Sequence, residues 1–322
     1  MSNHSKRNIL VTGGAGFIGS HLVDQLIEED CKSITVLDNF FLGNMKNLSS
    51  ALKRLPSLEV VRMDCSDISG LRDIISARKI DTVFNLAVVP LPTSLEYPAW
   101  TISTNISTVI NLCELARKNV FENLLHSSSS EAYGSAEYVP MDELHPLNAT
   151  TPYASSKAAG DKILETYVQT FGINARIVRP FNTVGPRQNS KTYAGIIPLV
   201  INRIKDKKEI LIHGDGLQTR DFIYVKDSVK LMLRILEEEK SKGMSINLAS
   251  GVELSIKDLV NKMLRIMNLT DYPVVHVEPR PGDVRRHLAD VSLCRDIIGS
   301  SPNSLSDAAI EETIDWYLKS DD

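Results

Sequence analysis

Two side chains four residues apart have the types that proton chemistry needs. Tyr153 and Lys157 stand at the ends of the segment Tyr-Ala-Ser-Ser-Lys. In a helix both would lie on one face. An ammonium group beside a phenol lowers the pKa of the phenol, so the tyrosine could serve as a general base. Because this spacing is also common among surface residues, its meaning depends on what surrounds it.

Three glycines near the N-terminus suggest what surrounds the pair. Gly13, Gly16 and Gly19 follow the apolar run Asn8–Thr12 and open a helical pattern that begins at Phe17. Glycine permits a tight turn and lets the backbone approach a pyrophosphate, while the helix N-terminus offers free N–H groups to the anion. A glycine triplet alone can be a structural turn. Between a strand and a helix it predicts a dinucleotide site.

A carboxylate favours one dinucleotide over the other. Asp38 ends the second apolar run, about 20 residues beyond the glycines, where a carboxylate accepts the ribose hydroxyls and repels a 2′-phosphate. The sequence therefore predicts NAD, although Asp38 could instead cap a turn. The positive nicotinamide would then help Lys157 to lower the pKa of Tyr153.

A polar segment follows the fifth apolar run. Ser127, Ser128, Ser129, Ser130 and Glu131 come where that run ends. Open α/β sheets hold their ligands at the carboxyl ends of the strands. We therefore expect this segment to border the site, and not to be a mere polar loop.

The strands and helices that must position these residues alternate along the chain. Short apolar runs predict buried strands, and the longer amphipathic stretches between them predict helices. We expect strands at Asn8–Thr12, Ser33–Asp38, Glu59–Met63, Thr82–Ala87, Asn123–Ser128 and Ala175–Arg179, and helices at Phe17–Glu29, Gly70–Arg78, Ser103–Lys118 and Pro152–Phe171. This order predicts an α/β fold, a Rossmann-type doubly wound parallel sheet.

The rhythm changes after about residue 180, where prolines interrupt it. We expect residues 1–180 to form the NAD-binding domain, with the catalytic Ser, Tyr and Lys in it. Residues 181–322 should form mainly a smaller C-terminal α/β substrate domain, with some chain exchange and a cleft between the two.

Composition excludes several classes of function. The 322 residues are 43% hydrophobic and 24% charged, with a net charge of −4, which disfavours a nucleic-acid partner. No apolar stretch approaches the roughly 20 residues that cross a bilayer. The four cysteines show no metal-site or disulfide spacing. We expect a cytoplasmic enzyme with no metal and no membrane partner.

Together these motifs resemble the extended short-chain dehydrogenase/reductase family, the NAD-dependent nucleotide-sugar epimerases and dehydratases. The resemblance extends from the glycine turn through Tyr153–Lys157 to Arg280-Pro281-Gly282-Asp283. It implies that Tyr153 is the catalytic base, that Lys157 orients it, and that Ser129 binds the sugar hydroxyl being oxidised. Asn105 resembles the start of the family's N-x-x-G-T, although the glycine is missing here.

The resemblance also implies two sets of contacts. The cofactor contacts are Gly13, Gly16, Phe17, Ile18, Gly19, Asp38, Asn39, Asp64, Cys65, Leu86, Ala87, Asn105, Tyr153, Lys157 and Pro180. The contacts to the nucleotide-diphosphate sugar are Ser94, Ser129, Ser130, Asn182, Arg187, Pro198, Leu199, His213, Arg220 and Arg280. The arginines suit a diphosphate because a guanidinium binds two oxygens. A lone arginine could equally be a solvated surface charge.

Glu131 bears on which reaction follows. The segment Ser129-Ser130-Glu131 is similar to the Thr-Ser-Glu of some nucleotide-sugar dehydratases and of UDP-glucuronate decarboxylases, whereas plain 4-epimerases usually carry a small or apolar residue in place of Glu131. A 4,6-dehydratase needs such a group to remove the C5 proton. Ser130, however, replaces the acidic aspartate of the dTDP-glucose type, and Glu131 could be a structural carboxylate.

The resulting prediction is an NDP-hexose 4,6-dehydratase that acts through a 4-keto sugar. The alternatives are a 4-epimerase of UDP-glucose, UDP-N-acetylglucosamine or UDP-glucuronate, a UDP-glucuronate decarboxylase, and a non-catalytic NAD-binding sensor or scaffold. The family also implies a homodimer through a four-helix bundle. Leu112, Cys113, Ile163 and Leu164 could supply its apolar surface, unless the core of the chain itself claims them.

Overall fold

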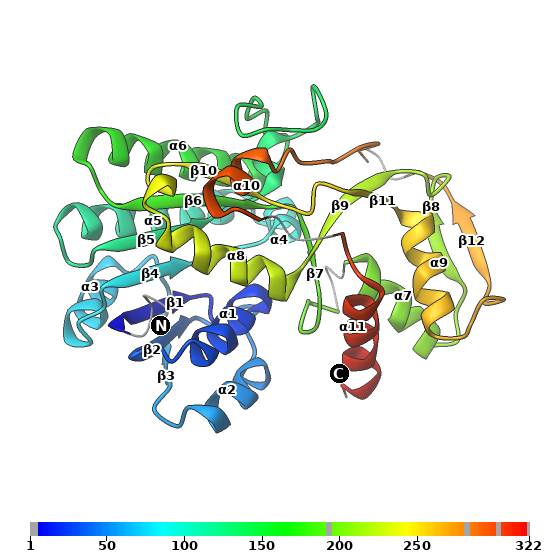
Figure 1. Cartoon of the computed structure of the whole chain (residues 1–322), viewed down its shortest axis with the longest axis horizontal. Helices are drawn as coiled ribbons and strands as arrows, with labels where there is room; N and C mark the ends of the chain where they lie inside the picture. The colour runs from blue at the N-terminus through cyan, green and yellow to red at the C-terminus, as the bar shows by residue number, and fades with distance from the viewer. Residues whose placement is uncertain (1–5, 191–194, 280–283, 301–303, 321–322) are drawn as a thin grey trace.

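A seven-stranded parallel sheet forms the centre of the larger lobe (Figure 1). The computed structural model describes residues 6–190, 195–279, 284–300 and 304–320. In spatial order the strands are β10 (Ser245–Leu248), β6 (Ala175–Pro180), β5 (Asn123–Ser127), β4 (Thr82–Asn85), β1 (Asn8–Thr12), β2 (Ser33–Asp38) and β3 (Glu59–Arg62). The order reverses direction at β1 and β4, as in doubly wound sheets. The predicted Rossmann-type fold is confirmed.

Helices cover both faces of this sheet, which explains why its strands are apolar throughout. On one face Ile9 and Val11 pack with α1 (Phe17–Glu28), α2 (Ser49–Arg54), α8 (Val225–Glu237) and α10 (Ser292–Ile298). On the other, Leu10 packs with α3 (Ile68–Ala77), α5 (Pro98–Arg117) and α6 (Pro152–Phe171). Successive side chains of β1 thus enter two separate cores, as the alternation along a strand requires.

The smaller lobe has its own core and two small sheets. One sheet orders β11 (Glu253–Ser255), β9 (Thr219–Tyr224) and β7 (Asn182–Val184), and the other pairs β12 (Val274–Val277) with β8 (Ile210–His213). Helices α7 (Ile196–Lys205), α9 (Ile256–Ile266) and α11 (Asp307–Lys319) pack around an apolar cluster there. Between these elements the chain returns to the larger lobe, to which it contributes α8, β10 and α10.

The predicted elements differ from the observed ones mainly at their ends. The first long helix of the pair, α5, begins at Pro98 and not at Ser103, because proline suits the first turn of a helix. The other, α6, has the predicted bounds: Thr151 caps it by accepting from the Ala154 amide at 3.1 Å, and Gly172 ends it in the left-handed conformation.

Several short elements had no counterpart in the prediction. Before residue 180 these are the helices α2 and α4 (Leu91–Glu96) and the 3-10 helices η2 (Met45–Leu48) and η3 (Ser130–Tyr133). After residue 180, where no bounds were predicted, the short elements include η4 (Glu239–Ser241). Within the described part of the chain, no helix combines the length and apolarity that a membrane span needs.

The apolar side chains considered for a dimer surface belong instead to the fold itself. Leu112, Cys113 and Leu164 are fully or almost fully buried in the core beneath α5 and α6, and Ile163 packs against that core. A dimer formed through α5 and α6 would therefore have to use other side chains of these helices.

Candidate functional site

A cleft of about 1230 Å³ opens at the carboxyl ends of the central strands. The structure places every cofactor contact expected from the sequence around it: Gly13, Gly16, Phe17, Ile18, Gly19, Asp38, Asn39, Asp64, Cys65, Leu86, Ala87, Asn105, Tyr153, Lys157 and Pro180. These residues lie at or just after the ends of β1, β2, β3, β4 and β6, or on the helices α1, α5 and α6. Such a convergence is the usual place of a ligand in an open α/β sheet.

The glycine turn leaves the start of α1 open to the cleft. Gly16 caps the helix without a side-chain hydrogen bond, and the first turn holds no acidic residue. Gly13 has a positive φ of 66°, and a Cβ on Gly19 would overlap the Gly13 carbonyl oxygen. The first backbone N–H groups of a helix have no partner within the helix. Here only glycine backbone lies beside them, so they can bind the pyrophosphate of a dinucleotide.

Asp38 holds the turn and lines the cleft at once. Its carboxylate accepts hydrogen bonds from the Ala15 amide at 3.0 Å and from the Phe40 amide at 2.8 Å. Burial raises its pKa, and these two amides counteract the rise. The capping role considered for Asp38 is therefore present together with its position in the cleft. Next to it, Asn39 donates to the Asp64 carboxylate at 2.9 Å.

Sequence reasoning missed a second support of the glycine turn. The Ala15 carbonyl accepts hydrogen bonds from the Asn44 amide at 3.0 Å and from the Asn47 side chain at 2.9 Å. Both asparagines, with Lys46 between them, line the cleft. The sequence feature that could have predicted this support is Asn44, which caps η2, because asparagine is favoured at the N-caps of helices. A four-residue helix carries too little periodicity to be predicted.

Asn105 ties three elements together below the cleft. Its side chain accepts from the Val89 amide at 2.8 Å, and donates to the Val89 carbonyl at 3.0 Å and to the Ser156 hydroxyl at 2.9 Å. It thereby joins α5 to the loop after β4 and to α6. The missing glycine of the family motif does not prevent this arrangement.

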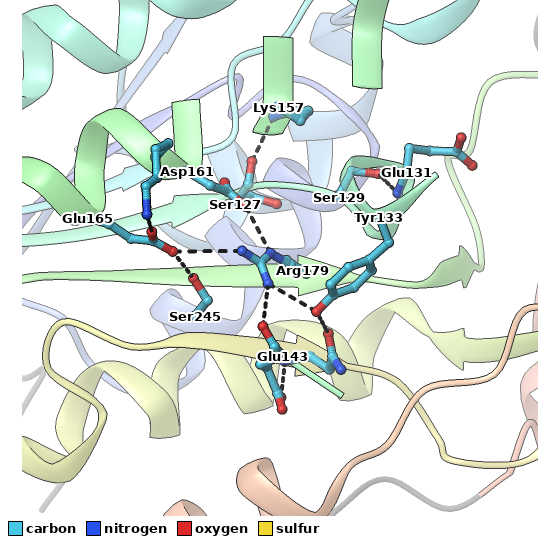
Figure 2. Close-up of polar contacts among 12 residues, drawn as sticks. Ser127, Ser129, Glu131, Tyr133, Glu143, Lys157, Asp161, Glu165, Arg179 and Ser245 are labelled. Atoms are coloured by element: carbon cyan, nitrogen blue, oxygen red, sulfur yellow. Dashed lines mark hydrogen bonds and ion pairs between the residues drawn. The ribbon is translucent and has the colours of Figure 1, made fainter. Parts of the chain in front are cut away.

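Burial shifts the pKa values of both Tyr153 and Lys157. Burial raises the pKa of Tyr153 to about 12, and a hydrogen bond with Ser129 opposes the rise. Burial also lowers the pKa of Lys157 to about 8, against the influence of Asp161. The Lys157 ammonium donates to the Ser127 carbonyl at 2.7 Å (Figure 2). Burial therefore dominates the pKa of Tyr153 in the chain without NAD, and the expectation that Lys157 and the nicotinamide lower it stays a prediction.

Ser129 and Glu131 are held by a tight turn. The Ser129 hydroxyl caps η3 by accepting from the Glu131 amide at 3.1 Å. The Glu131 side chain is exposed and points away from Lys157 (Figure 2). Desolvation by its surroundings raises its pKa, against the influence of Arg220 on β9. Within the described residues its carboxylate accepts no hydrogen bond. This disfavours the alternative that Glu131 is a structural carboxylate.

The expected substrate contacts are only partly gathered at the cleft. Ser129 and Arg187 line it, and Arg187 also forms an ion pair with Asp24 of α1 at 2.7 Å. Ser94 and Ser130 are buried; the Ser94 hydroxyl donates to the Leu91 carbonyl at 2.5 Å and so stabilises α4. These two serines do not line the cleft.

The remaining substrate contacts lie on the smaller lobe. Arg220 donates to the Val284 carbonyl at 2.7 Å, and the Asn182 side chain donates to the Asp221 carbonyl at 3.3 Å. His213 contacts the Glu278 carbonyl at 2.9 Å through its ring. The structure places Asn182, Pro198, Leu199, His213 and Arg220 outside the lining of the cofactor cleft, with Pro198 buried in α7. Arg280 lies outside the described residues.

Comparison with known proteins decides the family. Residues 9–249 match the model of the NAD dependent epimerase/dehydratase family. The chain belongs to this family. A UDP-glucose 4-epimerase of Mycolicibacterium smegmatis is 31% identical over 310 residues, covering 96% of this chain and 97% of that protein. A dTDP-glucose 4,6-dehydratase of Streptomyces antibioticus is 31% identical over 317 residues, covering 96% and 92%.

Solved structures agree with this assignment to the epimerase/dehydratase family. A UDP-N-acetylglucosamine 4-epimerase from Methanobrevibacter ruminantium M1, in complex with UDP-N-acetylmuramic acid, superposes with a TM-score of 0.90 at 33% identity, and 99% of each chain is covered. The chain is an NAD-dependent enzyme that modifies nucleotide sugars. Among the described residues, no group of His, Cys, Asp and Glu is arranged to hold a metal ion.

Proposed function

We propose that this enzyme is an NDP-hexose 4,6-dehydratase. The observation that carries the proposal is Glu131: its carboxylate accepts no hydrogen bond within the described residues, its pKa is raised by desolvation, and it stands two residues after Ser129, which lines the cleft. A raised pKa suits a group that must both take and give a proton near neutral pH. A 4-epimerase has no step that requires such a group.

The residues divide the chemistry as follows. Tyr153 removes the proton of the C4 hydroxyl, which Ser129 holds, and Lys157 orients the tyrosine. When bound, NAD would accept the C4 hydride and supply it again at C6. Glu131 removes the C5 proton of the 4-keto sugar and passes it to the C6 hydroxyl, which leaves as water. Once the hydride is at C6, C5 takes up a proton from solvent through Glu131, which completes the 4-keto-6-deoxy sugar. The start of α1 and Asp38 hold the cofactor.

Exchange from deuterated water tests the proposal. The enzyme is incubated in D₂O with UDP-, dTDP-, GDP- and CDP-hexoses, and the products are examined by mass spectrometry and NMR. We expect a 4-keto-6-deoxy sugar with deuterium at C5. The Glu131→Gln variant should form this product at least about 100-fold more slowly, as expected when an acid/base group is removed. An isomer of the substrate without deuterium would refute the dehydratase.

A 4-epimerase is the second candidate, and two observations favour it. Ser130, where the dTDP-glucose type carries an acidic aspartate, is buried and cannot act as an acid. Relatives with UDP-sugar 4-epimerase activity in their names also cover nearly the whole chain. An epimerase would need only Tyr153, Lys157 and Ser129. Release of carbon dioxide from UDP-glucuronate in the same experiment would identify a decarboxylase instead.

We also propose a homodimer formed by α5 and α6, with the enzyme in the cytoplasm. The two helices have 20 residues each and pack side by side at the edge of the larger lobe (Figure 1). Ile110 on α5 and Phe171 at the end of α6 are exposed apolar side chains on this pair.

The division of the chain into an NAD-binding part before residue 181 and a substrate-binding part after it likewise stays a proposal.

A further inference from the structure

A buried ion pair lies behind the catalytic helix. The Arg179 guanidinium on β6 donates from Nε to the Asp161 carboxylate on α6 at 2.8 Å. Both side chains are at most 2% exposed, and neither lines the cleft. Asp161 follows Lys157 by one helical turn, so the ion pair holds the same stretch of helix that presents Tyr153 and Lys157.

The same arginine reaches the turn that carries Ser129 and Glu131. Its Nη1 donates to the Tyr133 hydroxyl at 3.1 Å, and the guanidinium lies 5.0 Å from the centre of the Tyr133 ring (Figure 2). Tyr133 is fully buried and donates to the Asn247 side chain on β10 at 2.7 Å. Tyr133 is also the last residue of η3, whose cap is Ser129.

These contacts connect the part of α6 that carries Tyr153 and Lys157 to the turn that carries Ser129 and Glu131. Lys157 and Asp161 lie on α6, Arg179 bridges from β6, and Tyr133 ends the turn of Ser129. A buried ion pair is weak support for stability, because desolvation of the two charges offsets most of their attraction. Its geometric effect is definite, because each of its hydrogen bonds fixes one element relative to the next.

We propose that Asp161 and Arg179 are positioning residues which, through the Tyr133 hydroxyl, fix the Ser129–Glu131 turn relative to Tyr153 and Lys157. The inference rests on the roles proposed for Ser129 and Tyr153 but not on the choice between dehydratase and epimerase. The identity of the product decides that choice. The change in kcat tests the positioning roles of Asp161 and Arg179. Either the proposed reaction or the proposed positioning can therefore fail while the other holds.

Tyr133→Phe is the sharpest test, because it removes one oxygen and leaves the ring in place. We expect kcat to fall about 10- to 100-fold, the range that a small misplacement of catalytic groups produces. KM and the affinity for NAD should change less than about twofold, because Tyr133 does not line the cleft. Asp161→Asn should give the same pattern.

Glu165→Gln is the matched control. Glu165 lies one further turn along α6, is 25% exposed, and approaches Arg179 only to 3.9 Å. An ion pair at this distance, with a partly exposed carboxylate, contributes little, so kcat should stay within about twofold of the parent. A fall in kcat as large as that of Tyr133→Phe would show a general sensitivity of α6 and overturn the proposal.

A double-mutant cycle with Ser129→Ala separates positioning from loss of structure. If the Tyr133 hydroxyl acts by placing Ser129, its removal costs less once the Ser129 hydroxyl is gone, and the two losses in kcat are not multiplicative. Fully multiplicative losses would overturn the proposal, as would an unchanged kcat in Tyr133→Phe. Thermal unfolding of each variant verifies that the folded enzyme is being measured.

Discussion

At the scale of single residues, the site contains an ammonium group that destabilises the chain. Lys157 is surrounded by protein, which lowers its pKa from 10.5 to about 8. The unfolded chain therefore binds this proton more tightly than the folded one. The difference corresponds to about 3 kcal/mol of stability lost at neutral pH and regained as the pH rises through the window from 8 to 10.5.

Lys157→Met should reverse this cost while abolishing activity. The free energy of unfolding of the variant is compared with that of the parent, both without NAD. We expect the variant's gain over the parent to be about 3 kcal/mol larger at pH 7 than at pH 10.5. Other groups that titrate in this range, such as Tyr153, are present in both proteins and cancel in the comparison. Urea unfolding at several pH values measures the difference. A difference that does not vary with pH would contradict the lowered pKa.

Single residues also show where sequence reasoning ends. Gly13, Asp38, Tyr153 and Lys157 could be predicted because each lies at a fixed offset from a strand or helix whose pattern is clear. Arg187 was expected as a substrate contact, but its positive φ of 68° and its ion pair with Asp24 could not be predicted, because they depend on how the loop after β7 meets α1. The raised pKa of Tyr153 likewise depends on burial, to which the spacing of Tyr-x-x-x-Lys is blind.

At the scale of elements, the glycine turn and α1 depend on one close backbone approach. A Cβ on Gly19 would overlap the Gly13 carbonyl oxygen. Gly19→Ala should therefore displace the turn from the start of α1 and weaken NAD binding more than about 100-fold, since the pyrophosphate loses its N–H donors. Isothermal titration of NAD measures the effect.

Gly172→Ala is the control at the same scale. Gly172 ends α6 with a positive φ of 68°, and a Cβ there would meet nothing within 4 Å. Its replacement should lower the free energy of unfolding by about 1 kcal/mol and leave NAD affinity unchanged. Equal losses of NAD affinity in both variants would show that the Gly19 contact has no special role.

The elements themselves were predictable in proportion to their length. The six strands β1 to β6 and the helix α6 follow from apolar runs and periodicity, and even the ends of α6 agree, because Thr151 and Gly172 are strong caps. The turn η3 did not follow, since its four residues are set by Ser129 and by the buried ring of Tyr133. That ring is held by Arg179 and Asn247, which lie 46 and 114 residues away in sequence. Such long-range contacts leave no local pattern.

At the scale of the whole molecule, the two faces of the sheet bury separate cores, and within the described residues the outer surface of α5 and α6 exposes apolar side chains such as Ile110 and Phe171. Leu112 and Leu164 are buried in the core, so the proposed dimer would use outward residues such as Ile110, which is 38% exposed. Beside it, Tyr167 donates to Glu114 at 2.8 Å and Arg117 lies over the Phe171 ring at 5.2 Å. These contacts hold side chains in place on the surface where we propose that the dimer forms.

Ile110→Glu should therefore dissociate the proposed dimer, because it places like charges close together across a two-fold interface and removes apolar contact from its centre. Light scattering at micromolar concentration should give twice the chain mass for the parent and the chain mass for the variant. Leu318→Glu on α11, which is 47% exposed in the other lobe, should remain dimeric. A monomeric parent would refute the dimer. A dimer that survives Ile110→Glu but not Leu318→Glu would move the interface from α5 and α6 to the smaller lobe.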